Sequence, residues 1–201
     1  MSRVRLGILA GAAIVAIAAV IATTGISLVP TSLALGPCLK DWTSGVSYRP
    51  RLSPLASADL TVGDDRIRLC YGRPVRHNRT IFGGVVPFDS LWRMGANEPT
   101  RLYTGRPITF AGIPLAAGRY SVYTIPHRDR WEIFVSRSTL HWGNDISSAV
   151  RAREVGQATV PVEQLATPVE TLTVRTDSTG TEAFTIEWET TRVSLPVTPG
   201  H

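Results

Sequence analysis

Polar and apolar side chains alternate along most of the chain after residue 55, and this pattern restricts the fold more than any other feature. Residues 119–125 and 131–135 alternate with a period of two, which is the period of a β-strand with one buried face. Proline and glycine interrupt such runs about every 8–12 residues. The pattern predicts an all-β domain, either an antiparallel sandwich or a jelly-roll-like barrel.

The alternating runs account for one domain of ordinary size. The chain has 201 residues, which leaves room for one domain, or for one domain and an anchor. Gly63, Asp64 and Asp65 form a turn signal of the kind that joins two strands of a hairpin. We expect one short helix at 145–153 and strands at residues 57–62, 66–71, 85–92, 100–104, 108–111, 119–125, 131–135, 158–162, 170–176 and 182–193.

A long apolar segment precedes this domain. Between Leu6 and Leu39 the only ionisable side chain is the thiol of Cys38, and the strongly apolar part ends near Pro30. About 23 helical residues span roughly 34 Å, which is enough to cross the hydrocarbon core of a bilayer. Residues 6–29 are therefore expected to form a transmembrane helix.

The same segment has a second interpretation as a cleaved secretory signal. The apolar run is longer than the core of a typical signal peptide, so we favour an uncleaved signal-anchor. Arg3 and Arg5 precede the helix and place the N-terminus in the cytoplasm. The expected organisation is a cytoplasmic tail at 1–5, the helix at 6–29, a connector at 30–54, a periplasmic β-domain at 55–197 and a tail at 198–201. The sequence therefore predicts a single-pass protein of the bacterial inner membrane.

The predicted helix carries small residues on one face. Small side chains let helix backbones approach closely in a membrane, so this face is expected to pack against another helix. The alternative is that alanine is common for reasons of base composition alone. The residues of the face are Gly7, Gly11, Ala12, Ala16 and Ala19.

Cys38 and Cys70 are the two cysteines of the chain. Outside the cytoplasm an oxidising environment favours a disulfide between them, which would tie the connector to the first strand pair. The alternative is two isolated thiols, one buried in a strand and one near the membrane. Neither cysteine lies in a motif of redox catalysis or haem attachment.

Residues 92–98 form the most distinctive short motif. Trp92, Arg93, Asn97 and Glu98 surround Gly95, a residue that tolerates the positive φ of a tight turn. Arg93 and Glu98 could pair through two parallel hydrogen bonds. The group is expected either to line a polar pocket for a carboxylate or sugar, or to form a structural network that fixes a corner of the sandwich. We favour the network.

With other motifs, these residues resemble an uncharacterised bacterial family, a domain of unknown function that is often exported. The resemblance rests on Ile81-Phe82-Gly83, on the 92–98 motif, on Ala117-Gly118-Arg119-Tyr120-Ser121, on Ile125-Pro126, on Trp131 and on Trp142-Gly143. It covers about residues 53–197. It implies a β-rich fold and brings no activity or catalytic residue with it.

Motifs for catalysis or cofactor binding are missing from the sequence. The single lysine, Lys40, argues against a P-loop and against Schiff-base chemistry. The histidines His77, His127 and His141 lie far apart, without the spacing of a metal site. Glu187 and Glu189 flank Trp188 and are expected on a solvated strand face. We therefore expect no enzyme activity, no metal and no cofactor.

The net charge of +5 is concentrated in arginine. The basic stretch from Arg66 to Arg79 suits an acidic protein surface or anionic headgroups, and an exported domain does not meet nucleic acid. The sequence predicts a non-catalytic accessory subunit that stabilises a larger inner-membrane assembly, such as a respiratory or photosynthetic complex. Its partners would be other membrane-protein subunits and the bilayer. The alternative is a periplasmic binding module for a small carbohydrate-like or carboxylate ligand, and an enzyme with a spatially assembled site is the weakest hypothesis.

Overall fold

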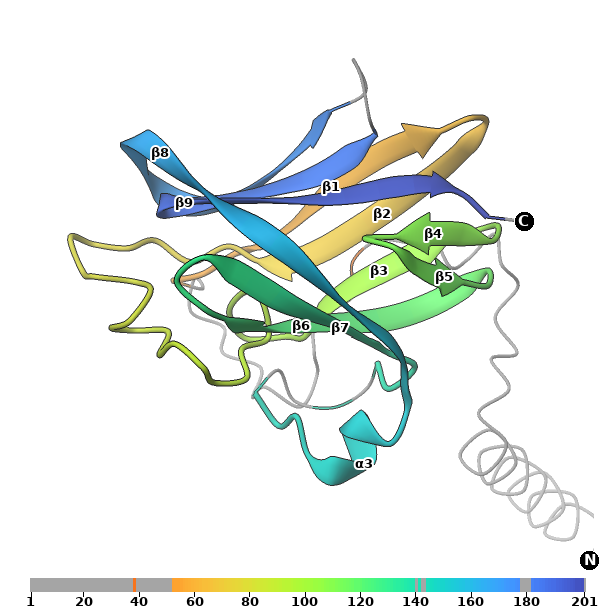
Figure 1. The fold of residues 1–201 in the computed structure, drawn as a ribbon, viewed down its shortest axis with the longest axis horizontal. Coiled ribbons are helices and arrows are strands. Elements are labelled where there is room, and N and C mark those ends of the chain that lie inside the picture. Colours follow the sequence, from red (N-terminus) through yellow and green to blue (C-terminus); the bar gives the residue numbers. More distant parts are fainter. Residues whose placement is uncertain (1–37, 39–51, 140, 142–143, 178–181, 201) are drawn as a thin grey trace, which may run out of the picture.

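A computed structural model describes residue 38 and residues 52–139, 141, 144–177 and 182–200. In these residues the protein is all-β, as predicted, with nine strands and one short helix (Figure 1). The strands are β1 (Leu55–Val62), β2 (Asp65–Gly72), β3 (Thr100–Thr104), β4 (Ile108–Phe110), β5 (Ile113–Leu115), β6 (Gly118–Pro126), β7 (Arg130–Ser136), β8 (Glu154–Asp177) and β9 (Ala183–Pro199), and the helix is α3 (Ser148–Arg151).

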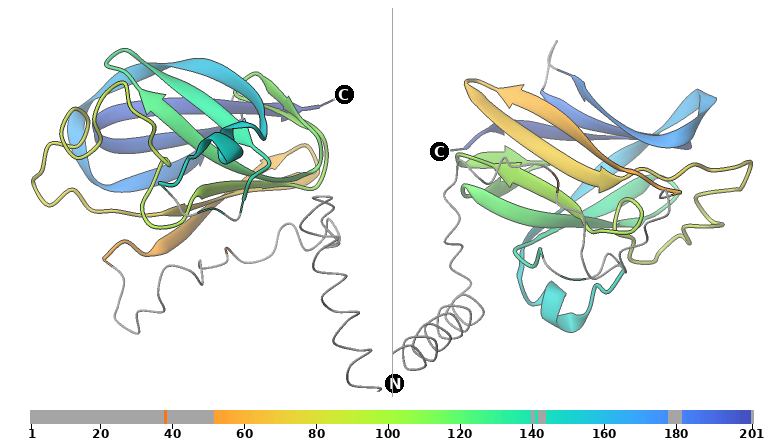
Figure 2. Two further views of the ribbon diagram at one scale, coloured as in Figure 1. Left: turned by 90° about the horizontal axis from the view of Figure 1, so that it is seen from below. Right: turned by 180° about the vertical axis from the view of Figure 1, so that it is seen from behind.

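All neighbouring strands pair antiparallel, in the order β1-β2-β3-β6-β7-β8-β9-β4-β5. The long strand β8 joins the two halves of this sheet. Its first part pairs with β7 up to Pro161, and its second part pairs with β9 from Val162 onward. Strand β8 thus crosses from one half to the other near Pro161 and Val162 (Figures 1 and 2), and the register of its pairing with β9 shifts between Gln164 and Val169. The sheet thus curls into a sandwich-like form with the core between its halves.

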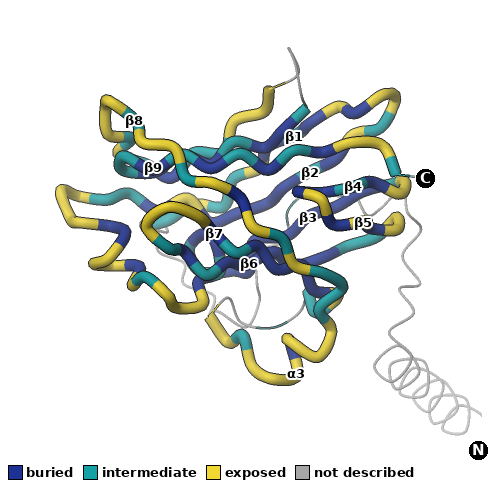
Figure 3. The backbone as a smooth tube through the Cα atoms, in the orientation of Figure 1, coloured by how far each residue is buried: buried dark blue, intermediate teal, exposed yellow. Residues whose placement is uncertain are grey.

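The core contains the apolar side of the alternation seen in the sequence. In β6 and β7 it takes Tyr120, Val122, Trp131, Ile133 and Val135, all buried (Figure 3). Four aromatic rings meet at its centre, with ring centroids 5.4–6.2 Å apart, at edge-to-face, tilted and stacked angles. These rings belong to Phe82, Trp92, Trp131 and Trp188.

The outer face of β6 and β7 has a small apolar cluster of its own. Tyr123, Phe134 and Val150 of α3 are buried there, with Ile125 and Ile146 packed against them. The Tyr123 hydroxyl donates a hydrogen bond of 2.6 Å to a carboxylate oxygen of Glu154. These contacts hold the segment that contains α3 over this face. The short helix predicted at 145–153 is present, but it covers only Ser148–Arg151.

The disulfide between Cys38 and Cys70 is also confirmed, with a Cα–Cα distance of 5.7 Å. Cys70 points to the outer face of β2, because its neighbours Leu69 and Tyr71 belong to the core. The bridge therefore fixes residue 38 on the outside of the β1–β2 hairpin. The predicted transmembrane helix at 6–29, with its small-residue face, lies outside the described residues. Within those residues, we find no helix of the length and apolarity that a bilayer crossing requires.

One predicted strand is wrong. Residues 85–92 belong to the connection between β2 and β3, which runs from residue 73 to residue 99 without a strand of its own. Val86 and Trp92 are buried, whereas Val85 and Leu91 are exposed. The apolar residues of this run therefore belong to a loop of which only a part packs against the core. Pro87 interrupts the run and disfavours a central strand.

Candidate functional site, the connection between β2 and β3

The connection at residues 73–99 is the candidate functional site. Connections longer than about 12–15 residues are uncommon in compact domains and are usually functional when they are ordered. It has two parts, which we name the outer loop (residues 73–91) and the corner (residues 92–98). The outer loop projects from the end of the sheet opposite the C-terminal end of β9 (Figures 1 and 2).

The first half of the outer loop is tied to β8. The backbone N–H of His77 donates to the Glu170 carboxylate at 2.8 Å, and the N–H of Arg76 donates to the Glu170 carbonyl at 2.9 Å. The Arg79 guanidinium folds back onto the carbonyls of Arg76 and Val75, at 2.8 and 3.0 Å. The long side chain of Arg79 thus closes a tight turn in a segment that contains no helix or strand.

The middle of the outer loop is tied to β9. Glu189 accepts hydrogen bonds of 3.3 Å from the N–H groups of Ile81 and Phe82 through one carboxylate oxygen. Glu189 has a φ of 54°, at a point where the pairing of β8 with β9 changes register. The irregular backbone turns this carboxylate toward the loop. This position keeps Phe82 inside the central aromatic group.

The prediction of a solvated face for Glu187 is wrong. Its side chain is buried on β9, where it accepts hydrogen bonds of 2.8 Å from Arg175 and 2.6 Å from Arg192. Burial by itself raises the pKa of Glu187, but the two guanidinium groups outweigh this and lower it. The side chains of Arg175 and Glu163 are 64% and 61% exposed. This group is an ion-pair network that stabilises the strand pair.

The end of the outer loop is tied to the β6–β7 hairpin through His127. Imidazole Nδ1 makes a short contact with the carboxylate of Asp89, and Nε2 lies 2.9 Å from the carboxylate of Glu132. The N–H of Asp89 also donates to the Pro126 carbonyl at 2.9 Å. The other two histidines lie away from this contact: His77 is exposed on the loop, and His141 contacts Ser138. In the described part of the chain, no group of three or more potential ligands could hold a metal ion.

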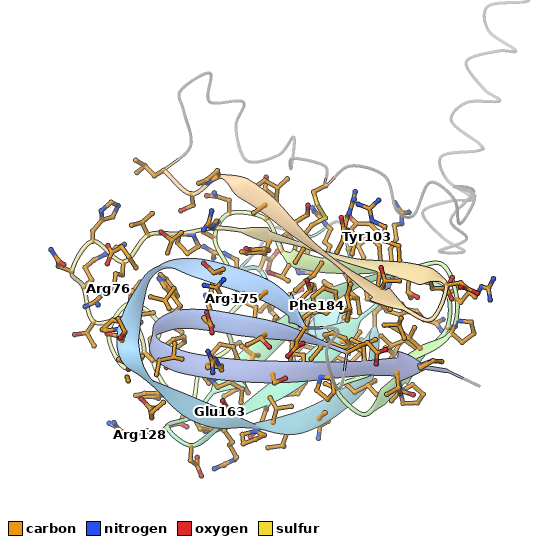
Figure 4. The ribbon with its side chains drawn as sticks, turned by 90° about the horizontal axis from the view of Figure 1, so that it is seen from above. Arg76, Tyr103, Arg128, Glu163, Arg175 and Phe184 are labelled. Atoms are coloured by element: carbon orange, nitrogen blue, oxygen red, sulfur yellow. A yellow bond between two sulfur atoms is a disulfide. The ribbon has the colours of Figure 1, made fainter. Side chains whose placement is uncertain are left out.

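The outer loop exposes apolar side chains. Three large hydrophobic residues are exposed in the described part of the chain, and two of them, Val85 and Leu91, belong to this loop (Figure 3). The third is Leu52, ahead of β1. The Arg128 guanidinium lies 4.7 Å from the ring centroid of Phe88, a cation–π contact between hairpin and loop. Arg76 and Arg128 mark this end of the molecule in Figure 4.

The corner is packed too closely to leave room for larger residues. The N–H of Ala96 donates to the Gly72 carbonyl at 3.2 Å, and a Cβ atom on Gly72 would lie 1.7 Å from the Ala96 carbonyl oxygen. Asn97 Nδ2 donates to the Ser53 carbonyl at 3.0 Å, and Thr100 Oγ1 donates to the Met94 carbonyl at 3.0 Å. These contacts join the start of β1, the end of β2 and the start of β3.

The four predicted residues of the 92–98 motif all lie in this corner. Trp92 is in the aromatic core and pairs with Thr124 of β6, and Glu98 is fully buried. Burial lowers the pKa of the Arg93 guanidinium, and the nearby charge of Glu98 partly offsets this. Asn97 connects to the segment before β1. The interpretation of the motif as a structural network stays a prediction.

Backbone conformations with positive φ are concentrated in the same connection. The described residues include seven non-glycine residues with positive φ, and five of them lie between residues 73 and 99. Such conformations are unfavourable for side chains larger than glycine and persist where surrounding contacts impose them. They are found at functional sites more often than elsewhere. The five residues are His77, Asn78, Asp89, Met94 and Asn97.

Sequence reasoning identified the corner and missed the outer loop. Its anchors Glu170, Glu189 and His127 come from distant parts of the chain, so no local spacing reveals them. A usable signal was present in the cluster of turn-forming residues Pro74, Gly83, Gly84 and Pro87 within an otherwise apolar stretch.

Comparison with known proteins gives a family and no function. A family model described as "Protein of unknown function (DUF2911)" matches residues 53–197, which includes the whole connection and all but the last two residues of the nine strands. No curated protein matches the chain. No solved structure matches it either.

Proposed function

This chain belongs to the DUF2911 family of proteins of unknown function, and from its outer loop we propose that it is a non-catalytic interaction domain. In this proposal the domain is anchored by residues 6–29, faces the periplasm, and acts as an accessory subunit of a larger inner-membrane assembly. One observation carries the proposal. A long loop is held in a fixed shape by two carboxylates and one imidazole from other parts of the chain, and it presents two apolar side chains to solvent.

The fixed shape of the loop is what suits it to binding. A flexible loop loses conformational entropy when a partner orders it, and a preorganised loop does not. Glu170, Glu189 and His127 hold the outer loop at its start, middle and end. In this arrangement Val85 and Leu91 stay exposed, and a partner that covered the outer loop would bury both side chains.

The chemistry of the loop fits protein contact better than catalysis. The described residues of the outer loop and the hairpin beside it offer imidazole, carboxylates and guanidinium groups that already bind one another. Arginine next to exposed apolar side chains is typical of protein interfaces. A stable partner interface would bury about 1,200–2,000 Å² in total, so the outer loop would form its centre and the neighbouring hairpin its rim.

The test uses the full chain extracted from membranes in a mild detergent. The variant V85S/L91S removes both exposed side chains, and L52S is the matched control because Leu52 is exposed but lies outside the loop. We expect wild-type protein and L52S to migrate in one assembly larger than the monomer, and V85S/L91S to migrate as the monomer with an unchanged melting temperature. Wild-type protein that ran as a monomer would refute the proposal, and so would a V85S/L91S variant that stayed in the assembly.

The predicted small-residue face of the anchor gives a second arm to this test. Replacing Gly7 and Gly11 by leucine should weaken the same assembly without changing the fold of the β-domain, because bulky side chains keep helix backbones apart. An unchanged assembly would show that the anchor does not contribute to the interface, and the outer loop would be the only contact under test.

One observation favours the alternative of a binding module for a small carboxylate. The Nε atom of Arg93 is buried and makes no hydrogen bond with any described residue. A carboxylate ligand would supply the missing acceptor. Acetate, succinate and galacturonate added at 10 mM, on the order of a weak binding constant, should then raise the melting temperature of wild-type protein and not of R93M. The absence of any shift would exclude this alternative.

A further inference from the structure

The contact between His127 and two carboxylates has a consequence for the outer loop. We propose that His127 is a protonation-sensitive latch, which fixes residues 87–91 of the outer loop against the β6–β7 hairpin when the imidazole is charged. Both ring nitrogens face a carboxylate oxygen, Nδ1 that of Asp89 and Nε2 that of Glu132. The His127 side chain is 16% exposed, so water does not readily replace either contact.

The latch depends on the number of protons that an imidazole carries. The charged ring has two N–H donors and can donate to both carboxylates, whereas the neutral ring has one donor and one lone pair. In the neutral state one carboxylate therefore faces a lone pair and loses its hydrogen bond. The attraction between one positive and two negative groups is lost at the same step. Histidine is the side chain that ordinarily changes charge between pH 5 and 8.

The structure identifies which of the two contacts opens. The Asp89 side chain is 76% exposed and the Glu132 side chain is 35% exposed. Water can hydrate the freed carboxylate of Asp89 more completely than that of Glu132, so the contact to Asp89 is the one to break. Asp89 also has a φ of 60°, and its release lets the backbone leave this unfavourable conformation.

The moving segment is bounded on both sides by contacts that do not involve His127. On one side the N–H of Gly83 donates to the Val86 carbonyl at 2.8 Å, and on the other Trp92 and Thr124 exchange two backbone hydrogen bonds. Residues 87–91 lie between them. Leu91, one of the two apolar side chains that the proposed function assigns to the partner, moves with this segment.

The other charged groups of the turn make contacts of their own. Arg128 lies over the Phe88 ring, and Asp129 pairs with Arg130 at 3.1 Å within the turn. On β8 the residue that pairs with Glu132 is Thr159, which is uncharged. The acidic groups on His127 are thus Asp89 from the loop and Glu132 from β7, and the basic groups of the turn do not replace the imidazole.

Hydrogen exchange of the full chain in detergent tests the latch without any partner. The Asp89 N–H, which donates to Pro126, reports the latched state, and the Trp92 N–H, which donates to Thr124, reports the intact fold. Rates are measured at pH 5.5 and 8.0 and divided by the intrinsic rate at each pH. We expect the Asp89 amide to be protected about tenfold more at pH 5.5 and the Trp92 amide to be protected equally at both.

Two histidine variants separate the latch from general effects of pH. In H127Q the Asp89 amide should show the low protection of pH 8.0 at both pH values. In H77Q, which changes the exposed histidine of the same loop, the difference should stay at about tenfold. Equal protection of wild-type Asp89 at the two pH values would overturn the proposal, as would a pH difference that persists in H127Q.

A third variant covers the case in which H127Q does not fold, seen as loss of protection at Trp92. D89N keeps the shape of the side chain and removes its charge, so it should reduce the pH difference at this amide to less than threefold. A difference that stays tenfold in D89N would overturn the latch. The effect of the latch on partner binding rests on the proposed function, but these measurements do not. V85S/L91S should keep the full pH difference even if no partner binds.

Discussion

Replacing Gly72 by alanine tests whether the corner is as rigid as its geometry implies. An added Cβ would lie 1.7 Å from the Ala96 carbonyl oxygen, 2.6 Å from its carbonyl carbon and 3.0 Å from its nitrogen. All three are backbone atoms, so no side-chain rotation can relieve the contact. A separation of even 3.0 Å from the oxygen requires a shift of about 1.3 Å. That shift breaks the hydrogen bond from Ala96 N–H to the Gly72 carbonyl.

The cost combines overpacking with a lost buried hydrogen bond. Overpacking of a well-packed core costs about 1–3 kcal/mol, and an unsatisfied buried donor costs about 1–3 kcal/mol more. We expect G72A to lower the free energy of unfolding by about 3–5 kcal/mol. For a domain of this size that is a fall in melting temperature of roughly 6–20 °C. The fluorescence of the buried tryptophans, followed through a urea titration with the disulfide intact, measures it.

Gly105 provides the matched control. A Cβ atom there meets nothing within 4 Å. G105A should therefore leave the stability unchanged or raise it by about 0.4–1 kcal/mol, because alanine reduces the freedom of the unfolded chain. A G72A variant within 0.5 kcal/mol of wild type, on the order of an ordinary surface substitution, would show that the corner yields easily and would refute the argument from close packing.

Three further substitutions test other parts of the fold. Hydrogen bonds from Arg68 and Arg66 lower the pKa of Asp59 from 3.8 to about 2. This stabilisation is complete above about pH 4 and is lost as the pH falls toward 2, so D59N should unfold with a shallower pH dependence in that range, as acid titration by circular dichroism will measure. W131A should lower stability by about 3–5 kcal/mol in urea, because the ring contacts Phe82 and Trp92 at the centre of the core. C70S should lower it by about 3–4 kcal/mol, to the value that wild-type protein shows in reductant, because the bridge closes a sequence separation of 32 residues.

The hairpin of β6 and β7 could be predicted from the sequence because its strands obey a local rule. Alternate residues of each strand enter the main core, among them Tyr120, Val122, Ile133 and Val135, so the period-two pattern of residues 119–125 and 131–135 falls inside the observed strands. The short strand β5 was missed. It has three residues with Pro114 in the middle, and such a run is too short for an alternation to be seen.

Strand β8 was predicted as two strands, at 158–162 and 170–176. The structure has one strand of 24 residues. The irregular pairing between Gln164 and Thr173 hides the alternation, because each shift of register exchanges the side chains of the two faces. A pattern search treats such a stretch as a loop.

The candidate site also has one part that the sequence predicts, the corner, and one part that it does not predict, the outer loop. The corner is encoded within seven residues and could be recognised from the sequence as a tight, glycine-containing turn. The outer loop depends on contacts across 38 residues for Asp89 with His127 and across more than 90 for His77 with Glu170. Pairings at such separations are set by the topology of the sheet, which a single sequence does not specify.

The strand β8 also determines how this protein can fold and unfold. It is hydrogen-bonded to β7 in one half of the sheet and to β9 in the other. Neither half can therefore unfold without breaking the hydrogen bonds of a strand that both halves share. The hairpin of β4 and β5 is held by the last residues of β9, where Ile108 pairs with Pro199. During synthesis, nearly ninety further residues must therefore be added to the chain before β9 can pair with the edge of this hairpin. Unfolding should accordingly be a single cooperative transition, and folding on the ribosome should finish late and abruptly rather than strand by strand.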